Sequence, residues 1–379
     1  MLGTSCRGQG DTGGGRRGAL MYRGGEIDRQ VSDTWTPPGR LTATGAPVDR
    51  ETAGYTEVNG LWVPTGALRD DDDVARGRRS HPRGIGYRLD ALTRARILAG
   101  RHPDWVLSGW SAADVWGLPW FCDDADTCAV APVTPRLARD AADCTVRRRT
   151  PALAGVATVA VDPLCPSLRI TPPVLTVIHC LQSVWRGDHR WDVPGGTGLS
   201  DRGLRAVQTV DALCTLFGVA PAALQEACRD QFRAAVLRRI LAVADQGTDS
   251  PMETVMRLKV SGILRTLVDR GALADLPDLT AQLVVHADGT TSDPVHTGIT
   301  GAGRIVARLD LGMGSLRLGL QYDGSGHLMK EQRDRDSRVT AELANLDWHT
   351  LRLTFGHLTD DGLLWKTVTD GIRLCLSRL

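Results

Sequence analysis

The sequence predicts an α/β protein, α+β overall, in which a C-terminal mixed sheet flanked by helices follows an α+β region. Three observations predict this class. Segments with helical spacing alternate with short runs rich in β-branched residues and leucine. Apolar residues make up 42% of the chain, which is enough for large buried cores. The length of 379 residues exceeds what one core usually serves, so we expect two or three domains.

The overall charge is balanced, with 45 lysines and arginines against 44 acids. A basic surface for DNA must therefore be local. No apolar window reaches the length of a membrane span, which is about 20 residues, and the N-terminus has no signal-peptide core. We expect no membrane partner and a cytoplasmic location. The nine cysteines include no CxxC pair, which fits a reducing compartment. Cys122 and Cys128 are the most closely spaced cysteines in the sequence, and the alternative to free thiols is that these two bind a metal ion.

The first part of the chain has three predicted segments. Residues 1–25 are rich in Gly and Arg and should form a disordered tail. In residues 26–68, an apolar alternation at 57–64 predicts a strand, a turn and a second strand, as in the wing of a small winged-helix module. Residues 69–85 contain the run RDDDDVARGRR, which lacks periodicity and predicts a solvated linker.

Residues 86–245 are predicted to form an α+β and helical region. Ser111 is the expected N-cap of one of its helices. An arginine-rich helix near the end either contacts phosphates or is merely solvated. The predicted helices are residues 89–99, 111–116, 174–185, 206–217 and 221–244, and the predicted strands are residues 145–149, 157–161 and 168–171.

The motifs of this region carry a family resemblance. The segments SGWSAADVWGLP and ITPPVLTVIHCLQ, with the arginines of residues 147–149 between them, resemble actinobacterial proteins related to abortive-infection antitoxins. In that family the domain follows a winged-helix reader. The resemblance implies an antitoxin-like transcriptional regulator with a toxin partner. Ordinary core packing explains the same Trp and Gly residues as an alternative.

Residues 250–379 are predicted to form a separate α/β domain. Ser250 suits the N-cap of its first helix, Pro251 the first helical position and Glu253 a capping box. Strands are expected at residues 279–286, 304–311, 316–324 and 348–354, and further helices at residues 330–346 and 363–379.

Two aspartates in this domain are candidate metal ligands. Asp310 and Asp323 lie near the ends of two strands that follow one another as a hairpin, so they are expected to meet at one sheet edge. Paired carboxylates suit Mg²⁺, which prefers oxygen ligands and keeps waters for attack on a phosphodiester. His327 follows closely enough to act as a proton donor or water ligand. The alternative is that Asp323 and Gly324 form an ordinary turn.

Four motifs of residues 250–379 carry a second resemblance. The segments SPMET, RLDLGM, LQYDGSGH and RDRDSR, the last followed by LANLDWHTLRLT, resemble the restriction-endonuclease-like domain of very-short-patch repair endonucleases. The resemblance implies a DNA endonuclease that uses Mg²⁺ or Mn²⁺. It makes Asp310 the principal metal ligand, Asp323 a second acid, Glu253 a helix-borne acid and His327 a proton shuttle. The DNA-binding residues that it implies are Lys330, Arg333 and Arg338.

The chain departs from this family at Gln321, where glutamate is usual. An amide oxygen can bind a metal ion, but it carries no charge and cannot act as a base, so we expect a weakened site. Three functions follow from the sequence. The first is a metal-dependent DNA endonuclease, the second a non-enzymatic antitoxin-like regulator, and the third a protein-interaction module.

Overall fold

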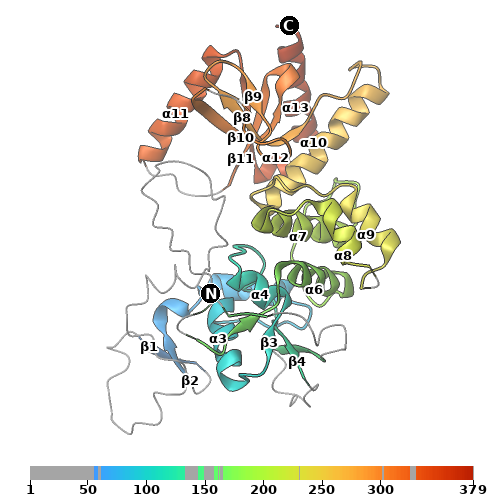
Figure 1. Cartoon of the computed structure of the whole chain (residues 1–379). Helices are drawn as coiled ribbons and strands as arrows, with labels where there is room; N and C mark the ends of the chain where they lie inside the picture. The colour runs from blue at the N-terminus through green and yellow to red at the C-terminus, as the bar shows by residue number, and fades with distance from the viewer. Residues whose placement is uncertain are drawn as a thin grey trace, which may run out of the picture.

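The computed structural model stacks three layers in chain order, coloured blue to green, yellow-green and orange to red in Figure 1. It confirms the mixed α/β class, with two mixed five-stranded sheets and flanking helices. The first described element is an antiparallel hairpin of β1 (Tyr55–Val58) and β2 (Leu61–Pro64), which confirms the predicted strand pair. The predicted tail and most of the predicted winged-helix module lie outside the described residues. These are residues 55–58, 61–132, 144–148, 158–160, 162, 165–229, 231–300, 303–324 and 330–378.

The run of aspartates and arginines predicted as a linker forms helix α2 (Asp71–Ser80), so that prediction is wrong. The Asp70 side chain caps the helix by accepting a hydrogen bond of 2.8 Å from the N–H of Asp72. Acidic residues fill the first turn, and Arg78 and Arg79 lie in the last, which matches the helix dipole. The charges therefore specify a helix even though they show no apolar periodicity.

Two helices pack on the first mixed sheet. The Asp90 side chain caps α3 by accepting a hydrogen bond of 2.6 Å from the N–H of Thr93. Helix α4 begins at Gly109, before the serine that was predicted to cap it. Ser111 instead accepts a 2.9 Å hydrogen bond from the N–H of Cys128 and ties the helix to the sheet. The helices are α3 (Ala91–Arg101) and α4 (Gly109–Val115), and the strands in sheet order are β5 (Cys144–Arg148), β4 (Thr127–Ala131), β3 (Val106–Leu107), β7 (Arg169–Ile170) and β6 (Val159–Ala160).

A layer of helices separates the two sheets (Figure 1). Helix α6 (Pro173–Arg186) confirms the prediction there. Helix α7 (Asp201–Phe217) begins at Asp201 rather than at residue 206, because the Ser200 side chain caps it by accepting from the N–H of Gly203. Both helices are largely buried, so this layer is part of the core and not a solvated connection.

The long helix predicted over residues 221–244 is interrupted. The structure has α8 (Leu224–Ala227), after the 3₁₀ turn η3 (Pro221–Ala223), and then α9 (Ala234–Leu241). Phe232 lies between α8 and α9 and packs edge to face on the Trp185 ring, with 5.8 Å between ring centroids. This tertiary contact outweighs the helical periodicity of the sequence, so the prediction of one helix is wrong.

The C-terminal sheet is antiparallel except for one parallel pair at its edge. Strand β10 lies between β8 and β11, and β11 pairs in parallel with β12, so β12 is an edge strand. Leu353 is the fully buried residue of β12, and the other residues of this strand are partly or fully exposed. In sheet order the strands are β12 (His349–Thr354), β11 (Leu318–Asp323), β10 (Ile305–Met313), β8 (Thr280–His286) and β9 (Thr291–Ser292).

Helices cover both faces of this sheet, as Figure 1 shows. Leu343 of α11 packs with Leu283 and Leu309 on one face. The other face packs against α10 and α13, and it belongs to the same buried cluster as the central helices. These elements are α10 (Pro251–Asp269), α11 (Lys330–Asn345), α12 (Phe355–Thr359) and α13 (Asp361–Leu376), with the 3₁₀ turn η4 (Gly314–Leu316) between β10 and β11.

A buried ion pair joins α10 to the central helices. Arg257 of α10 donates to Asp211 of α7 at 2.8 Å. Asp211 also accepts from the Thr254 hydroxyl at 2.9 Å and from the N–H of Asp245 at 2.8 Å. Because the carboxylate is fully buried and accepts three hydrogen bonds, its charge is compensated, and the N-terminal part of α10 is held firmly against α7.

In the described part of the chain, no single helix is long and apolar enough to cross a membrane, although α7 taken together with the bent segment Pro221–Ala227 reaches that length and composition.

Candidate functional site

The N-terminus of α10 places a carboxyl group inside the protein. Ser250 is the N-cap, and its hydroxyl accepts a hydrogen bond of 3.3 Å from the N–H of Glu253. The Glu253 carboxylate accepts a 3.0 Å hydrogen bond from the N–H of Asp249, so the reciprocal cap reaches one residue further back than a standard capping box. Glu253 is 7% exposed. The cap predicted from sequence is confirmed, and it fixes this acid below the surface.

Gln282 on β8 holds the same carboxylate from the sheet. Its side-chain amide donates to Oε2 of Glu253 at 2.8 Å. The backbone of Gln282 has φ +55°, a left-handed conformation that non-glycine residues rarely adopt. Such strain of about 1–3 kcal/mol persists where the surrounding structure enforces it and often marks functional sites. The strained residue therefore turns an amide toward the N-terminus of α10.

Asp310 reaches the same place from the centre of the sheet. The registers Leu309 to Leu283 and Leu311 to Ala281 place it beside Gln282. The carboxylate of Asp310 accepts a 2.7 Å hydrogen bond from the N–H of Tyr322 on β11. This side-chain bond continues the contact between β10 and β11 where their backbone pairing ends. Asp310 is thus fixed in position and lies near the Glu253 carboxyl group.

Both carboxyl groups are costly to ionise in this environment, and each has a nearby acid that adds to the cost. Burial raises the pKa of Glu253, and the nearby Asp310 raises it further. Burial also raises the pKa of Asp310, against the hydrogen bond from Tyr322, which lowers it. A buried acid beside a partly buried one favours keeping a proton or holding a cation. The pair is therefore a candidate cation site.

Arg308 lies beside the acid pair, and the sequence did not single it out. Arg308, two residues before Asp310 on β10, forms an ion pair of 3.3 Å with Asp249. The Nε of Arg308 is shielded from solvent and has no hydrogen-bond partner among the described residues. The alternation of side chains along a strand was the signal that could have identified Arg308. Gln282 gave no such signal, since its role depends on the strand pairing.

The structure gives Asp310 other acidic neighbours than Asp323, its predicted partner. The acids that interact electrostatically with Asp310 are Glu253 and Asp249. Asp323 lies at the end of β11, is 42% exposed, and forms a long ion pair of 4.0 Å with Arg352 of the parallel strand β12. Gln321 lies one step beyond the last paired residues of β10 and β11, next to Asp310, and opposite Arg352. The amide that replaces an acid is thus near the site.

The remaining predicted residues are only partly placed. His327 lies outside the described residues. Lys330 and Arg333 belong to α11, as predicted, but their side chains are not among those described. Arg338 is exposed on the same helix. Their predicted roles in proton transfer and DNA binding stay predictions.

The donor set suits a hard divalent cation better than a transition metal held by nitrogen or sulfur. Glu253 and Asp310 offer carboxylate oxygens and Gln321 an amide oxygen. Mg²⁺ commonly binds to one or two carboxylates and keeps several waters. Over the described ranges, no three His, Cys, Asp or Glu side chains are grouped to hold a metal ion. The residues therefore fit a cation that is largely hydrated.

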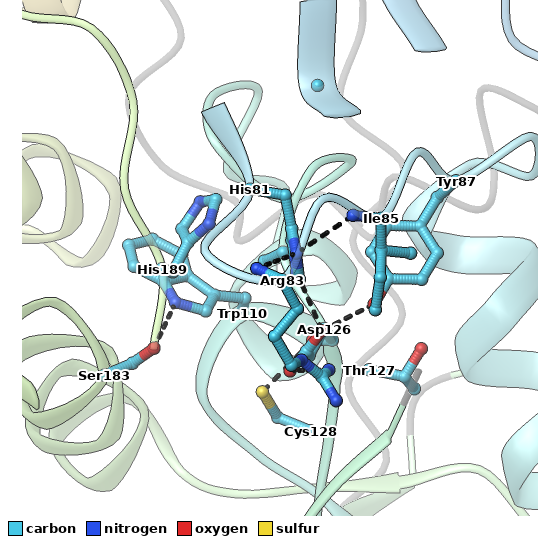
Figure 2. A network of polar contacts seen from close by, with 12 residues as sticks. His81, Arg83, Ile85, Tyr87, Trp110, Asp126, Thr127, Cys128, Ser183 and His189 are labelled. Carbon is cyan, nitrogen blue, oxygen red and sulfur yellow. Dashed lines mark hydrogen bonds and ion pairs between the residues drawn. The ribbon is translucent and has the colours of Figure 1, made fainter. Parts of the chain in front are cut away.

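A second polar cluster lies between α2 and the first sheet (Figure 2). His81 and Asp126 are 3.0 Å apart, as in a catalytic dyad. Nδ1 of His81 accepts from the N–H groups of Arg83 at 3.2 Å and Ile85 at 3.4 Å, so the proton lies on Nε2 and is donated to Asp126. Asp126 also accepts from the Tyr87 hydroxyl at 2.5 Å and from Arg83 at 2.6 Å. The cluster therefore anchors this segment, and the His81 ring has no lone pair left to act as a base.

His189 lies next to this cluster, in an aromatic environment. Its ring is 5.0 Å from the Trp110 ring, centroid to centroid, and Nε2 donates to the carbonyl of Phe121 at 3.0 Å. Nδ1 of His189 is buried and has no hydrogen-bond partner within the described ranges. Burial lowers the pKa of His189 to about 3, so the ring is neutral at ordinary pH. It is a core residue.

The thiols of Cys122 and Cys128 are occupied in ordinary hydrogen bonds. Cys122 donates to the carbonyl of Trp120 at 3.3 Å, and Cys128 donates to the carbonyl of Asp126 at 3.2 Å. Both are buried. A metal ligand would be a thiolate with no proton to donate, so this geometry does not favour the alternative of a metal site at these two residues.

Comparisons with known proteins leave the site to be judged on its geometry: a scan against protein-family models, a search of curated proteins and a search of solved structures each find no match.

Proposed function

We propose that the C-terminal α/β unit is a DNA endonuclease-like domain of the restriction-endonuclease type, with a divalent-cation site built on Glu253 and Asp310. The observation that carries the proposal is the pair formed by the buried carboxyl group of Glu253 and the partly buried carboxyl group of Asp310, reached from a helix N-terminus and from the centre of a sheet and braced by the strained Gln282. The resemblance of residues 250–379 to very-short-patch repair endonucleases supports it independently.

Each residue near the pair has a distinct part in this proposal. Gln282 and the N–H of Asp249 orient Glu253, and the N–H of Tyr322 orients Asp310. Bound Mg²⁺ or Mn²⁺ would supply an activated water and positive charge at the phosphodiester. Arg308 carries a guanidinium beside the acids, and guanidinium groups suit phosphate oxygens in shape and charge.

A second candidate function is a DNA-binding regulator that does not cleave. The observation that favours it is Gln321, which puts a neutral amide beside Asp310 where the endonuclease family has a carboxylate. One fewer negative charge weakens the binding of a divalent cation. Asp323 pairs with Arg352 instead of joining Asp310, which also weakens the binding of a divalent cation.

Nicking of supercoiled plasmid DNA with Mg²⁺ or Mn²⁺ tests the proposal. We expect slow nicking by the wild type, none by Asp310→Ala and faster nicking by Gln321→Glu. Asp370→Ala is the matched control, because Asp370 lies on the far helix α13 in exposed ion pairs with Lys366 and Arg373. Nicking that survives in purified Asp310→Ala contradicts the site. Silence in all variants with DNA binding retained supports the regulator.

A further inference from the structure

The interruption between α8 and α9 opens a cleft on the central helical layer. Its volume is about 700 Å³, within the usual range for ligand sites, roughly 300–1,000 Å³. Leu237 and Cys228 are buried in its wall, and Phe232 is half-buried. The cleft is built by other elements than those that carry Glu253 and Asp310. The lining residues are Gln225, Glu226, Cys228, Arg229, Gln231, Phe232, Arg233, Ala234, Leu237 and Arg238.

Arginines dominate the charge of this lining. Arg229, Arg233 and Arg238 are all exposed at the rim. Glu226 is the one acid among the residues that line the cleft, and it forms an ion pair with Arg229. Arg233 and Arg238 have no acidic partner within the described ranges. Two uncompensated cations on a concave surface attract an anion.

Aromatic side chains extend this surface toward α6 and α7. Phe232 contacts the Trp185 ring, and the guanidinium of Arg202 lies 5.8 Å from the centre of that ring. Gln182 of α6 donates a 2.7 Å hydrogen bond to the carbonyl of Gln231 and so fixes the cleft wall. Exposed arginines interleaved with aromatic rings are typical of surfaces that bind nucleic-acid strands.

The spacing of the arginines fits a chain of phosphates better than a single small carboxylate. Arg233 precedes α9 and Arg238 lies in its last turn, so their backbone positions are roughly 7.5 Å apart along the helix axis. Phosphates of one DNA strand repeat on a similar scale. Both side chains are free of the core, since both are exposed, and can follow a backbone.

We propose that the α8–α9 cleft binds the phosphate backbone of a DNA strand and holds DNA for the site of Glu253 and Asp310. The proposal rests on the proposed function for its choice of DNA as the ligand. The binding itself needs neither cleavage nor a divalent cation.

Binding of a fluorescent DNA oligonucleotide to the full chain in EDTA tests the proposal. We expect Arg233→Ala with Arg238→Ala to bind more weakly, with the slope of log K against log salt smaller in magnitude by about 1.4 for a single strand, since each lost phosphate contact removes about 0.7. Arg265→Ala with Arg373→Ala is the matched control, because both arginines are exposed on other helices. Circular dichroism of each double variant verifies folding.

The outcomes separate this proposal from the proposed function. Unchanged affinity and salt slope in the cleft variant overturn the cleft, as does a wild type that binds no DNA. ATP that displaces the oligonucleotide at equal phosphate concentration would indicate a nucleotide site instead of a strand site. Asp310→Ala should bind as the wild type does. If the cleft variant loses binding while no protein nicks plasmid DNA, the cleft stands and the endonuclease proposal fails.

Discussion

Two buried polar clusters of this protein balance their charges in opposite ways. Around Asp126, one carboxylate accepts hydrogen bonds from His81, Tyr87 and Arg83. Around Glu253, a buried carboxyl group lies near the partly buried one of Asp310, and both have raised pKa values. The first arrangement stabilises the fold, because the desolvated charge is compensated. The second costs stability unless a proton or a cation is bound, which is typical of a site kept for function.

The largest effect is expected from Asp126→Ala. It leaves His81, Tyr87 and Arg83 without their shared acceptor, and removing one partner of a buried pair costs about 3–5 kcal/mol. Urea denaturation at pH 7 measures the free energy of unfolding. Asp370→Ala, in an exposed network, should leave this free energy nearly unchanged. An Asp126→Ala protein as stable as the control would remove the contrast between the two clusters.

The next largest effect is the pH dependence of stability that His189, beside the first cluster, should cause. Burial lowers the pKa of His189 to about 3, so the native ring stays neutral while the unfolded ring gains a proton below about 6.5. Stability from this group is present above pH 6.5 and falls by about 1.4 kcal/mol per pH unit as the pH drops toward 3. His189→Phe should lose this slope when unfolding is measured between pH 4 and pH 6.5. An identical slope in both proteins would exclude His189 as its source.

Glu253→Gln tests the second cluster. The raised pKa of Glu253 means that the native state binds its proton more tightly than the unfolded state does, so the stability that this group gives is full at low pH and is lost as pH rises through the folded pKa. The amide carries no charge to desolvate. We expect Glu253→Gln to be more stable than the wild type at pH 8, where the wild-type carboxyl group begins to lose the proton that its buried position favours. At pH 4 the two proteins should match.

Glu253→Asp is the companion variant, because it keeps the charge and shortens the side chain. It should show no gain in stability at pH 8. A gain equal to that of the amide would mean that packing, and not the carboxylate charge, sets the effect.

The smallest effect is the response to a divalent cation. A ligand present at its dissociation constant stabilises the native state by about 0.4 kcal/mol, and the neutral Gln321 should keep Mn²⁺ binding weak. Thermal unfolding with increasing Mn²⁺ should raise Tm in the wild type, raise it more in Gln321→Glu and leave it unchanged in Asp310→Ala. The same rise in Asp310→Ala would place the bound cation elsewhere.

Local sequence signals located much of the fold. Capping residues and periodicity predicted α3, α6 and α10 closely, since caps and apolar spacing act within a few residues. The predictions failed where distant contacts decide. Phe232 turns toward Trp185 and interrupts a helix that the periodicity favours. The charged run at α2 forms a helix because its ends match the helix dipole.

The candidate site shows the same division. Sequence by itself identified Glu253 and Asp310 as acids of interest, from a helix cap and from a strand pattern with a family resemblance. Only the tertiary structure decided that these two acids are partners, that Gln282 turns its amide to them through a left-handed backbone, and that Asp323 pairs with Arg352. The physical reason is that the charge state and the neighbours of a buried carboxyl group depend on burial and strand register, which join residues far apart in the chain.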